Sequence, residues 1–126
     1  MEGRVVKAGA AAGKALVSRE PISFFGGVDP ETGVVIDQGH ALEGRSVADR
    51  ILVFPTGKGS TVGSYTLYRL SRNGRAPAAI INREADPVVA VGAVIAGLPM
   101  VDQIDTERIH TGDWVQIDDG EVTVNG

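Results

Sequence analysis

The chain has 126 residues and a formal net charge of −4, and 43% of its residues are hydrophobic but only 5% aromatic. This size predicts one domain, residues 1–126, with a core of Val, Ile, Leu and Ala side chains. The twelve Lys and Arg residues are scattered along the sequence, which argues against a nucleic-acid partner because such a partner needs a basic face.

Short strand candidates separated by turns occupy the first part of the chain. They lie at Val5-Val6, 15–17, 21–25 and 34–36. The run 8–12 is interrupted by a glycine, so no helix is assigned to it. A turn is predicted at 29–33, which has the sequence Asp-Pro-Glu-Thr-Gly, and a loop at 39–44. We expect His40 in that loop to be a solvated side chain.

A strand–helix unit begins at 51–54, where four consecutive apolar residues predict a strand covered on both faces. A turn rich in glycine follows, and a helix is predicted over 61–72. Asn73 and Gly74 supply the left-handed end of that helix.

A second unit begins with a buried strand at 78–81 and a polar loop at 82–86. Its helix spans 87–96, with Pro87 in the first turn and Gly97 just past the end. This helix is apolar nearly all round, and its small residues allow a close approach to a neighbour. A short strand at 99–101 comes next.

The chain closes with a predicted hairpin, in which strands at 114–117 and 121–124 flank a turn at 118–120. The fold class is therefore α/β, with central parallel strands and added antiparallel strands. The loops 57–61 and 82–86 each follow a buried strand and precede a helix. They are expected at the carboxyl edge of the sheet, where ligands bind in open α/β folds.

The loop Gly57-Lys58-Gly59-Ser60-Thr61 is the strongest candidate site. Backbone N–H groups at a helix start, the helix dipole and the Lys58 ammonium group favour an anion. A simpler interpretation is that Ser60 only caps the helix. The spacing matches neither the phosphate-binding loop of NTPases nor the Gly-x-Ser-x-Gly elbow of hydrolases.

No metal site is predicted within this chain. It contains no cysteine, which excludes a disulfide framework, a thiolate nucleophile and the ordinary ligands of an iron–sulfur cluster. His40 and His110 lack a metal-like spacing, so any metal must come from another chain. No apolar run has the length of a membrane span, and the N-terminus lacks the apolar centre of a signal peptide, so we expect a cytoplasmic protein without membrane contact.

Four segments together resemble the small subunit of the aconitase X family, in order along nearly the whole chain. They are SFFGGVDPETG at 23–33, GRSVADRILVFP at 44–55, GKGSTVGSY at 57–65 and AIINREADP at 79–87. The resemblance implies a swivelling β/β/α domain like the fourth domain of aconitase. It also implies a large subunit that holds the iron–sulfur cluster, so that this chain itself binds no cofactor.

The archaeal branch of the family implies a hydro-lyase reaction, the dehydration of (R)-mevalonate 5-phosphate to trans-anhydromevalonate 5-phosphate in a modified mevalonate pathway. Aconitases have a similar Gly-x-Gly-Ser-Ser-Arg run whose first serine is the catalytic base, and this role transfers to Ser60. Thr61 and Val62 replace the second serine and the arginine, so the arginine's role does not transfer. The candidate substrate and anion ligands are Gly57, Lys58, Gly59, Thr61, Asn82 and Arg83.

Three alternatives stay open at this point. The substrate could be cis-3-hydroxy-L-proline, on which bacterial relatives act. The Thr111–Asp118 region also resembles the end of phosphohistidine swivel domains, although no histidine lies in the glycine-rich loop. Finally, the loop could hold an anion without any chemistry. Tyr65 and Trp114 are interpreted as packing residues. The arginines are interpreted as surface charges, namely Arg45, Arg50, Arg69, Arg72 and Arg83, of which Arg83 has the best case for a functional role because it lies on the same strand edge as Ser60.

Overall fold

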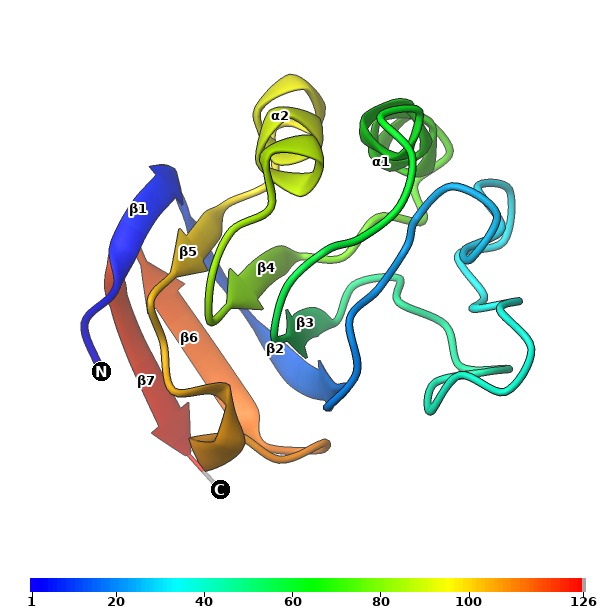
Figure 1. Cartoon of the computed structure of the whole chain (residues 1–126). Helices are drawn as coiled ribbons and strands as arrows, with labels where there is room; N and C mark the ends of the chain where they lie inside the picture. The colour runs from blue at the N-terminus through cyan, green and yellow to red at the C-terminus, as the bar shows by residue number, and fades with distance from the viewer. Residues whose placement is uncertain (126) are drawn as a thin grey trace.

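Seven strands, two α-helices and one short 3₁₀ helix make up this computed structural model, which describes residues 1–125 (Figure 1). In chain order they are β1 (Arg4–Lys7), β2 (Ala10–Val17), β3 (Ile51–Phe54), α1 (Gly63–Arg72), β4 (Ala79–Asn82), α2 (Pro87–Ala96), β5 (Met100–Asp102), η1 (Thr106–Arg108), β6 (Trp114–Asp118) and β7 (Glu121–Asn125). The bounds predicted for β3 and α2 are confirmed.

All seven strands belong to one sheet in the order β1-β5-β4-β3-β2-β6-β7. The strands β2, β3, β4 and β5 are parallel neighbours. β1 joins one side of this parallel group in the antiparallel direction, and β6 and β7 extend the other side. This topology confirms the predicted α/β class with a parallel centre and antiparallel additions.

β2 belongs to both halves of the sheet. Its N-terminal part pairs with β6, beginning with Ala10 opposite Asp118, and its C-terminal part pairs with β3. Just before β1, Glu2 forms a bridge with Glu121 of β7. The two ends of the sheet therefore meet and the sheet curls on itself, so that β1 and β7 lie side by side in Figure 1.

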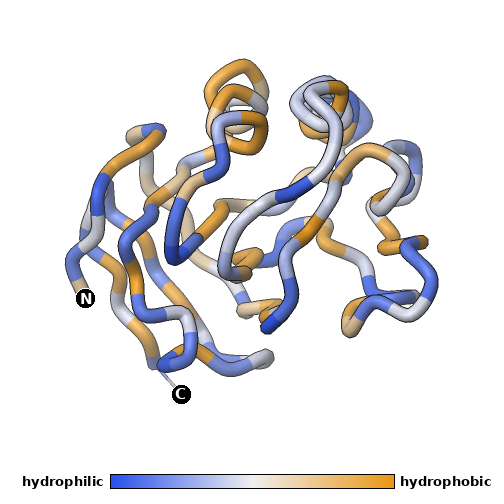
Figure 2. Tube along the Cα trace, in the orientation of Figure 1, coloured by the Kyte–Doolittle hydropathy of each residue, from blue (hydrophilic) through white to orange (hydrophobic). Residues whose placement is uncertain are grey.

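The core has two parts, one on each face of the sheet. The cluster under the helices includes Leu16, Leu52, Phe54, Leu67, Leu70, Ile80, Val89, Ala93 and Met100. The cluster inside the curl includes Ala15, Ile51, Val53, Ala79, Ile81, Val101, Val115, Ile117 and Val122. β3 supplies alternate residues to both clusters, which confirms that it is covered on both faces, and its residues are apolar in Figure 2.

The helices α1 and α2 lie next to each other over the same face of the sheet (Figure 1). Their close approach depends on Gly92, where an added Cβ would lie 2.6 Å from Leu67 Cδ1. This agrees with the prediction that the small residues of α2 allow tight packing. Neither helix of the described chain has the length and apolar character needed to cross a bilayer.

The chain between β2 and β3 forms isolated bridges, such as that between Val28 and Val35, and no named strand. The strands predicted at 21–25 and 34–36 are therefore wrong. Apolar residues in this segment, including Phe24, are buried against the helix-side core. Their apolar pattern reflects packing of a long loop and not pairing in a ladder.

His40 holds this long loop together. Its side chain is only 4% exposed, so the expectation of a solvated residue is wrong. Its Nδ1 accepts a hydrogen bond from Leu42 N–H at 3.0 Å, and its Nε2 lies 3.0 Å from Pro21 O. A neutral ring with its proton on Nε2 satisfies both contacts. The imidazole therefore ties the loop at 40–42 to the chain near Pro21.

Candidate active site at the glycine-rich turn

The turn 57–61 lies where the sequence predicts it, after β3 at the carboxyl edge of the parallel strands. Its start is fixed by Ile22, which follows β2. Ile22 N–H donates to Thr56 O at 3.2 Å, and Lys58 N–H donates to Ile22 O at 3.0 Å. The chain after β2 therefore supports the turn from one side.

Both glycines of the turn lie where a side chain would collide with a neighbour. A Cβ on Gly57 would overlap Val89 Cγ2 and would lie 3.3 Å from the Asp86 side chain. Gly59 has a φ of 97°, a conformation that favours glycine, and a Cβ there would overlap Ser23 Oγ. The turn is therefore pressed between the start of α2 and the segment around Ser23.

Ser60 is exposed on this turn, but it does not cap α1. The helix begins at Gly63 with Val62 at the N-cap position, two residues later than predicted. The chain first makes one more turn, in which Ser60 Oγ accepts a 3.2 Å hydrogen bond from Val62 N–H. Within residues 1–125, no protein group accepts a hydrogen bond from the N–H of Gly59, Ser60 or Thr61. The hydroxyl group thus lies among open backbone donors.

The two helix starts at this edge differ in charge. The N-terminus of α2 is neutralised by Asp86, whose carboxylate accepts from Val88 N–H at 3.0 Å and Val89 N–H at 3.3 Å. The first turn of α1 has no acidic residue and no side-chain cap. Lys58 is exposed and forms no ion pair with any other described residue. An anion at this edge is therefore favoured beside α1.

A hollow of about 300 Å³ lies beside the turn. It is lined by Ser23, Phe25, Gly26, Gly27, Asp37 and Lys58. Lys58 and Asp37 give it one charge of each sign. The sequence assigned no role to the 23–27 segment, although that segment belongs to the motifs that resemble the family.

Asn82 lies beneath the turn and not on its surface. Its side chain is fully buried, and its Nδ2 donates to Phe54 O at 2.9 Å and to Ile81 O at 3.2 Å. No described group donates to its Oδ1. In this conformation Asn82 ties the end of β3 to β4, and its predicted contact with a substrate would require this buried amide to become accessible.

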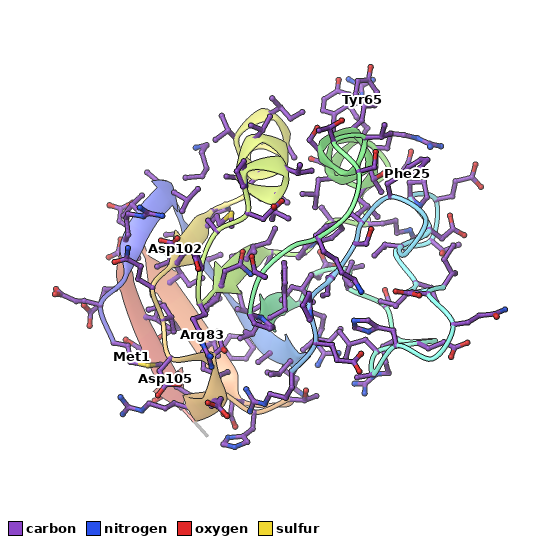
Figure 3. All side chains as sticks on the ribbon, in the orientation of Figure 1. Met1, Phe25, Tyr65, Arg83, Asp102 and Asp105 are labelled. Carbon is purple, nitrogen blue, oxygen red and sulfur yellow. The ribbon has the colours of Figure 1, made fainter. Side chains whose placement is uncertain are left out.

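Arg83 supports the turn through its backbone, because its N–H donates to Pro55 O at 3.0 Å. Its guanidinium group instead lies 3.3 Å from Glu107 and lines a separate hollow of about 540 Å³ with Gln103, Ile104 and Asp105. Figure 3 shows Arg83 near Asp105, away from Phe25. The structure does not bring the Arg83 side chain together with Lys58.

Asp102, for which no sequence motif predicts a role, fixes the neighbouring loop. This fully buried carboxylate binds Arg4 Nε at 2.9 Å and Arg4 Nη2 at 2.6 Å, and it accepts from Ala85 N–H at 2.9 Å. The hydrogen bonds that Arg4 donates to Asp102, together with the negative charge of that carboxylate, raise the pKa of the Arg4 guanidinium above its ordinary value. Ala85 directly precedes the residue that caps α2. By binding Ala85, Asp102 therefore fixes the start of α2, against which Gly57 packs.

A family model for the aconitase X swivel domain matches residues 1–125 of this chain. The chain belongs to this family. Among its aconitase X relatives, the phosphomevalonate dehydratase small subunit of Thermococcus sibiricus is 56% identical over 126 residues, covering 98% of this chain and 97% of that protein. The corresponding subunit of Methanosarcina acetivorans is 51% identical over 124 residues, which cover 96% of this chain and 86% of that protein.

A solved structure agrees. The crystal structure of holo-form aconitase X from Thermococcus kodakaraensis contains a chain that is 51% identical, with a TM-score of 0.97, covering 99% of this chain and 97% of that one. The resemblance inferred from the four sequence segments is therefore confirmed. The swivel-domain fold that it implied is confirmed as well.

Proposed function

We propose that this chain is the small subunit of a hydro-lyase that dehydrates (R)-mevalonate 5-phosphate to trans-anhydromevalonate 5-phosphate, and that Ser60 is its proton acceptor. The substrate is supported by relatives named phosphomevalonate dehydratase small subunit. The role of Ser60 is supported by one observation above all: its hydroxyl group lies among backbone N–H groups that have no acceptor within residues 1–125, close in sequence to Lys58, which forms no ion pair with any described residue.

The reaction removes a proton and a hydroxyl group from neighbouring carbons. Ser60 Oγ takes the proton, the electron pair of the broken C–H bond forms the double bond, and the hydroxyl group leaves with the electron pair of the C–O bond. A serine hydroxyl is a poor base near neutral pH and can act only when its alkoxide form is stabilised. The Val62 N–H, the Lys58 ammonium group and the dipole of α1 provide stabilisation for that negative charge.

The other predicted ligands contribute in different ways. Gly57 and Gly59 shape the turn, and the N–H groups of Gly59 and Thr61, which have no acceptor in the described part of the chain, can bind the anionic groups of the substrate. Lys58 supplies the mobile cation. Arg83 can meet the substrate only across the hollow that it shares with Glu107, where it could receive a carboxylate in exchange for that pair.

The iron–sulfur cluster of the family does not fit the residues of this chain. The chain has no cysteine, and its described residues include no group of three or more His, Asp or Glu side chains able to hold a metal. We place the cluster on the large subunit, and therefore the active site forms only where the two subunits meet. The isolated chain should fold, be colourless and have no dehydratase activity.

The test is an anaerobic dehydration assay with mevalonate 5-phosphate, using the complex of this chain with its large subunit. Ser60→Ala should lower kcat at least about a hundredfold with little change in KM, because it removes a proton acceptor. Ser71→Ala is the matched control, since that hydroxyl group only donates to Ala96 O at the far end of α1.

A rise in KM at unchanged kcat in Ser60→Ala would mean that the turn binds an anion without acting as a base. Turnover that survives in Ser60→Ala with both constants unchanged would place the base elsewhere. Activity on cis-3-hydroxy-L-proline but not on mevalonate 5-phosphate would replace the proposed substrate.

A further inference from the structure

Three large apolar side chains are exposed around Ser60. Phe25 is 54% exposed, Val62 is 47% exposed and Tyr65 is 62% exposed. They come together because the 23–27 segment packs on the first turn of α1, where a Cβ added to Gly63 would lie 3.6 Å from Phe25 N. Figure 3 shows Tyr65 and Phe25 on the same side of the molecule. The prediction that Tyr65 is a packing residue within the chain is therefore wrong.

The Tyr65 ring is held in place although it is exposed. It meets the Tyr68 ring edge-on, with 5.9 Å between the ring centroids and an interplanar angle of 68°. An aromatic side chain that is already oriented loses little conformational entropy when a partner covers it. Such residues are typical of the most strongly contributing positions in protein interfaces.

Farther along α1, the same face carries positively charged side chains. Arg69 and Arg72 are exposed one and two turns beyond Tyr65, and α1 contains no acidic residue. Neither arginine forms an ion pair with another described residue. This surface therefore calls for a partner with an apolar hollow for Val62 and Tyr65 and with carboxylates for the two arginines.

We propose that Phe25, Val62 and Tyr65, with Arg69 and Arg72 at the rim, form the surface by which this chain docks on the large subunit. The inference rests on the proposed function, in which the large subunit completes the site at Ser60. Val62 lies next to the reacting oxygen, since its N–H donates to Ser60 Oγ at 3.2 Å, so a chain that covers Ser60 also reaches the first turn of α1. Because α1 is positively charged, we infer that the docking face of the large subunit is acidic.

A second apolar face, on α2, provides the internal control. Val91, Val94 and Ile95 are about half exposed, and with Ala90 they line a hollow against Val6 of β1. α2 contains no charged residue. Its hollow opens toward β1 and therefore away from α1 and the Ser60 turn, so the proposal gives it no part in docking over the site.

The experiment is isothermal titration calorimetry of this chain into the purified large subunit. Tyr65→Ala should weaken binding roughly tenfold to thirtyfold, as expected for a central aromatic anchor. Val62→Ala should weaken binding several-fold, whereas Val94→Ala, which removes the same atoms from a 51% exposed position, should change Kd less than twofold. Arg69→Glu should weaken binding, and the loss should be larger at low salt.

Two further readouts separate docking from catalysis. Ser60→Ala should bind the large subunit as tightly as the unaltered chain, and Tyr65→Ala should regain full kcat at saturating concentration. If the complex dehydrates neither mevalonate 5-phosphate nor cis-3-hydroxy-L-proline but Tyr65→Ala still weakens binding to the large subunit, the docking surface is supported and the proposed function is contradicted. If Val94→Ala weakens binding and Tyr65→Ala and Val62→Ala do not, the large subunit docks on α2 and the inference is overturned.

Discussion

Gly57→Ala tests whether the candidate turn is pressed directly against α2. The added methyl group would overlap Val89 Cγ2, and Val89 is only 2% exposed within the core. The backbone at Gly57 is not left-handed, so the substitution introduces a steric overlap without dihedral strain. We expect it to lower the free energy of unfolding by about 1–3 kcal/mol, the usual cost of overpacking a core.

A double-mutant cycle with Val89→Ala isolates this contact. Val89→Ala alone removes two buried carbon atoms at about 0.8 kcal/mol each, plus a contribution from the cavity, and should cost roughly 2 kcal/mol. In the double variant the methyl group at position 57 fills part of that cavity. The combined loss should therefore be smaller than the sum of the two single losses by at least about 1 kcal/mol.

Urea unfolding followed by far-ultraviolet circular dichroism measures all four proteins of the cycle. Gly63→Ala is the matched control, because a Cβ there would lie 3.4 Å from Val88 Cγ1, an ordinary contact. It should leave stability nearly unchanged. If Gly57→Ala is neutral and the two substitutions add to within about 0.3–0.5 kcal/mol, the turn does not rest on Val89 and the reasoning about its shape is refuted.

Three other substitutions, each compared with a control variant, probe the contacts of the site and of the long loop after β2. Gly59→Ala should lower turnover of the complex more than roughly tenfold, because φ is 97° there and the new Cβ would overlap Ser23 Oγ. Gly44→Ala is its control, since Gly44 has a φ of 83° but open space around it. It should cost only about 1–2 kcal/mol of stability and leave turnover unchanged. Asp102→Ala should cost about 1–3 kcal/mol in urea unfolding, because the Ala85 N–H loses its acceptor, whereas the Arg4 side chain, 58% exposed, can be solvated. Arg83→Ala, which breaks an exposed pair, should cost less than about 1 kcal/mol, and equal losses for these two variants would contradict this ranking. His40→Ala should cost about 1–3 kcal/mol, whereas His110→Ala, at a 72% exposed side chain, should stay within about 0.5 kcal/mol, as thermal unfolding at constant pH would measure.

The sequence was most informative where proline, glycine or a continuous apolar run marks an element. Pro87 and Gly97 bound α2, and Gly97 adopts the left-handed conformation expected of it, with a φ of 73°. β2 could not be read from its first residues, because an alanine-rich run has no alternation of polarity. It is a strand because β6 pairs with it, a contact that depends on the other end of the chain.

The candidate turn was predictable for a similar reason, since strand, glycine turn and helix follow one another locally. Its surroundings were not. Ser23 meets Gly59 only through the path of the long loop after β2, and Asp102 meets Arg4 only because β1 and β5 are neighbours. The exposure of Tyr65 was missed because α1 has apolar residues around much of its surface, and only the packing on α2 decides which face is buried.

The double pairing of β2 has a consequence for how the molecule folds. The β6–β7 hairpin and the β3–α1–β4 and β4–α2–β5 units close over short stretches of chain, so their loop-closure entropy is small. β2 meets β6 only after the whole intervening sequence has been brought back, the kind of contact that slows folding. We therefore expect β2 docking to be the late, cooperative step that joins the two halves. The Ser60 turn should take its final shape only in that step, because Ile22 and Ser23, which support it, follow β2.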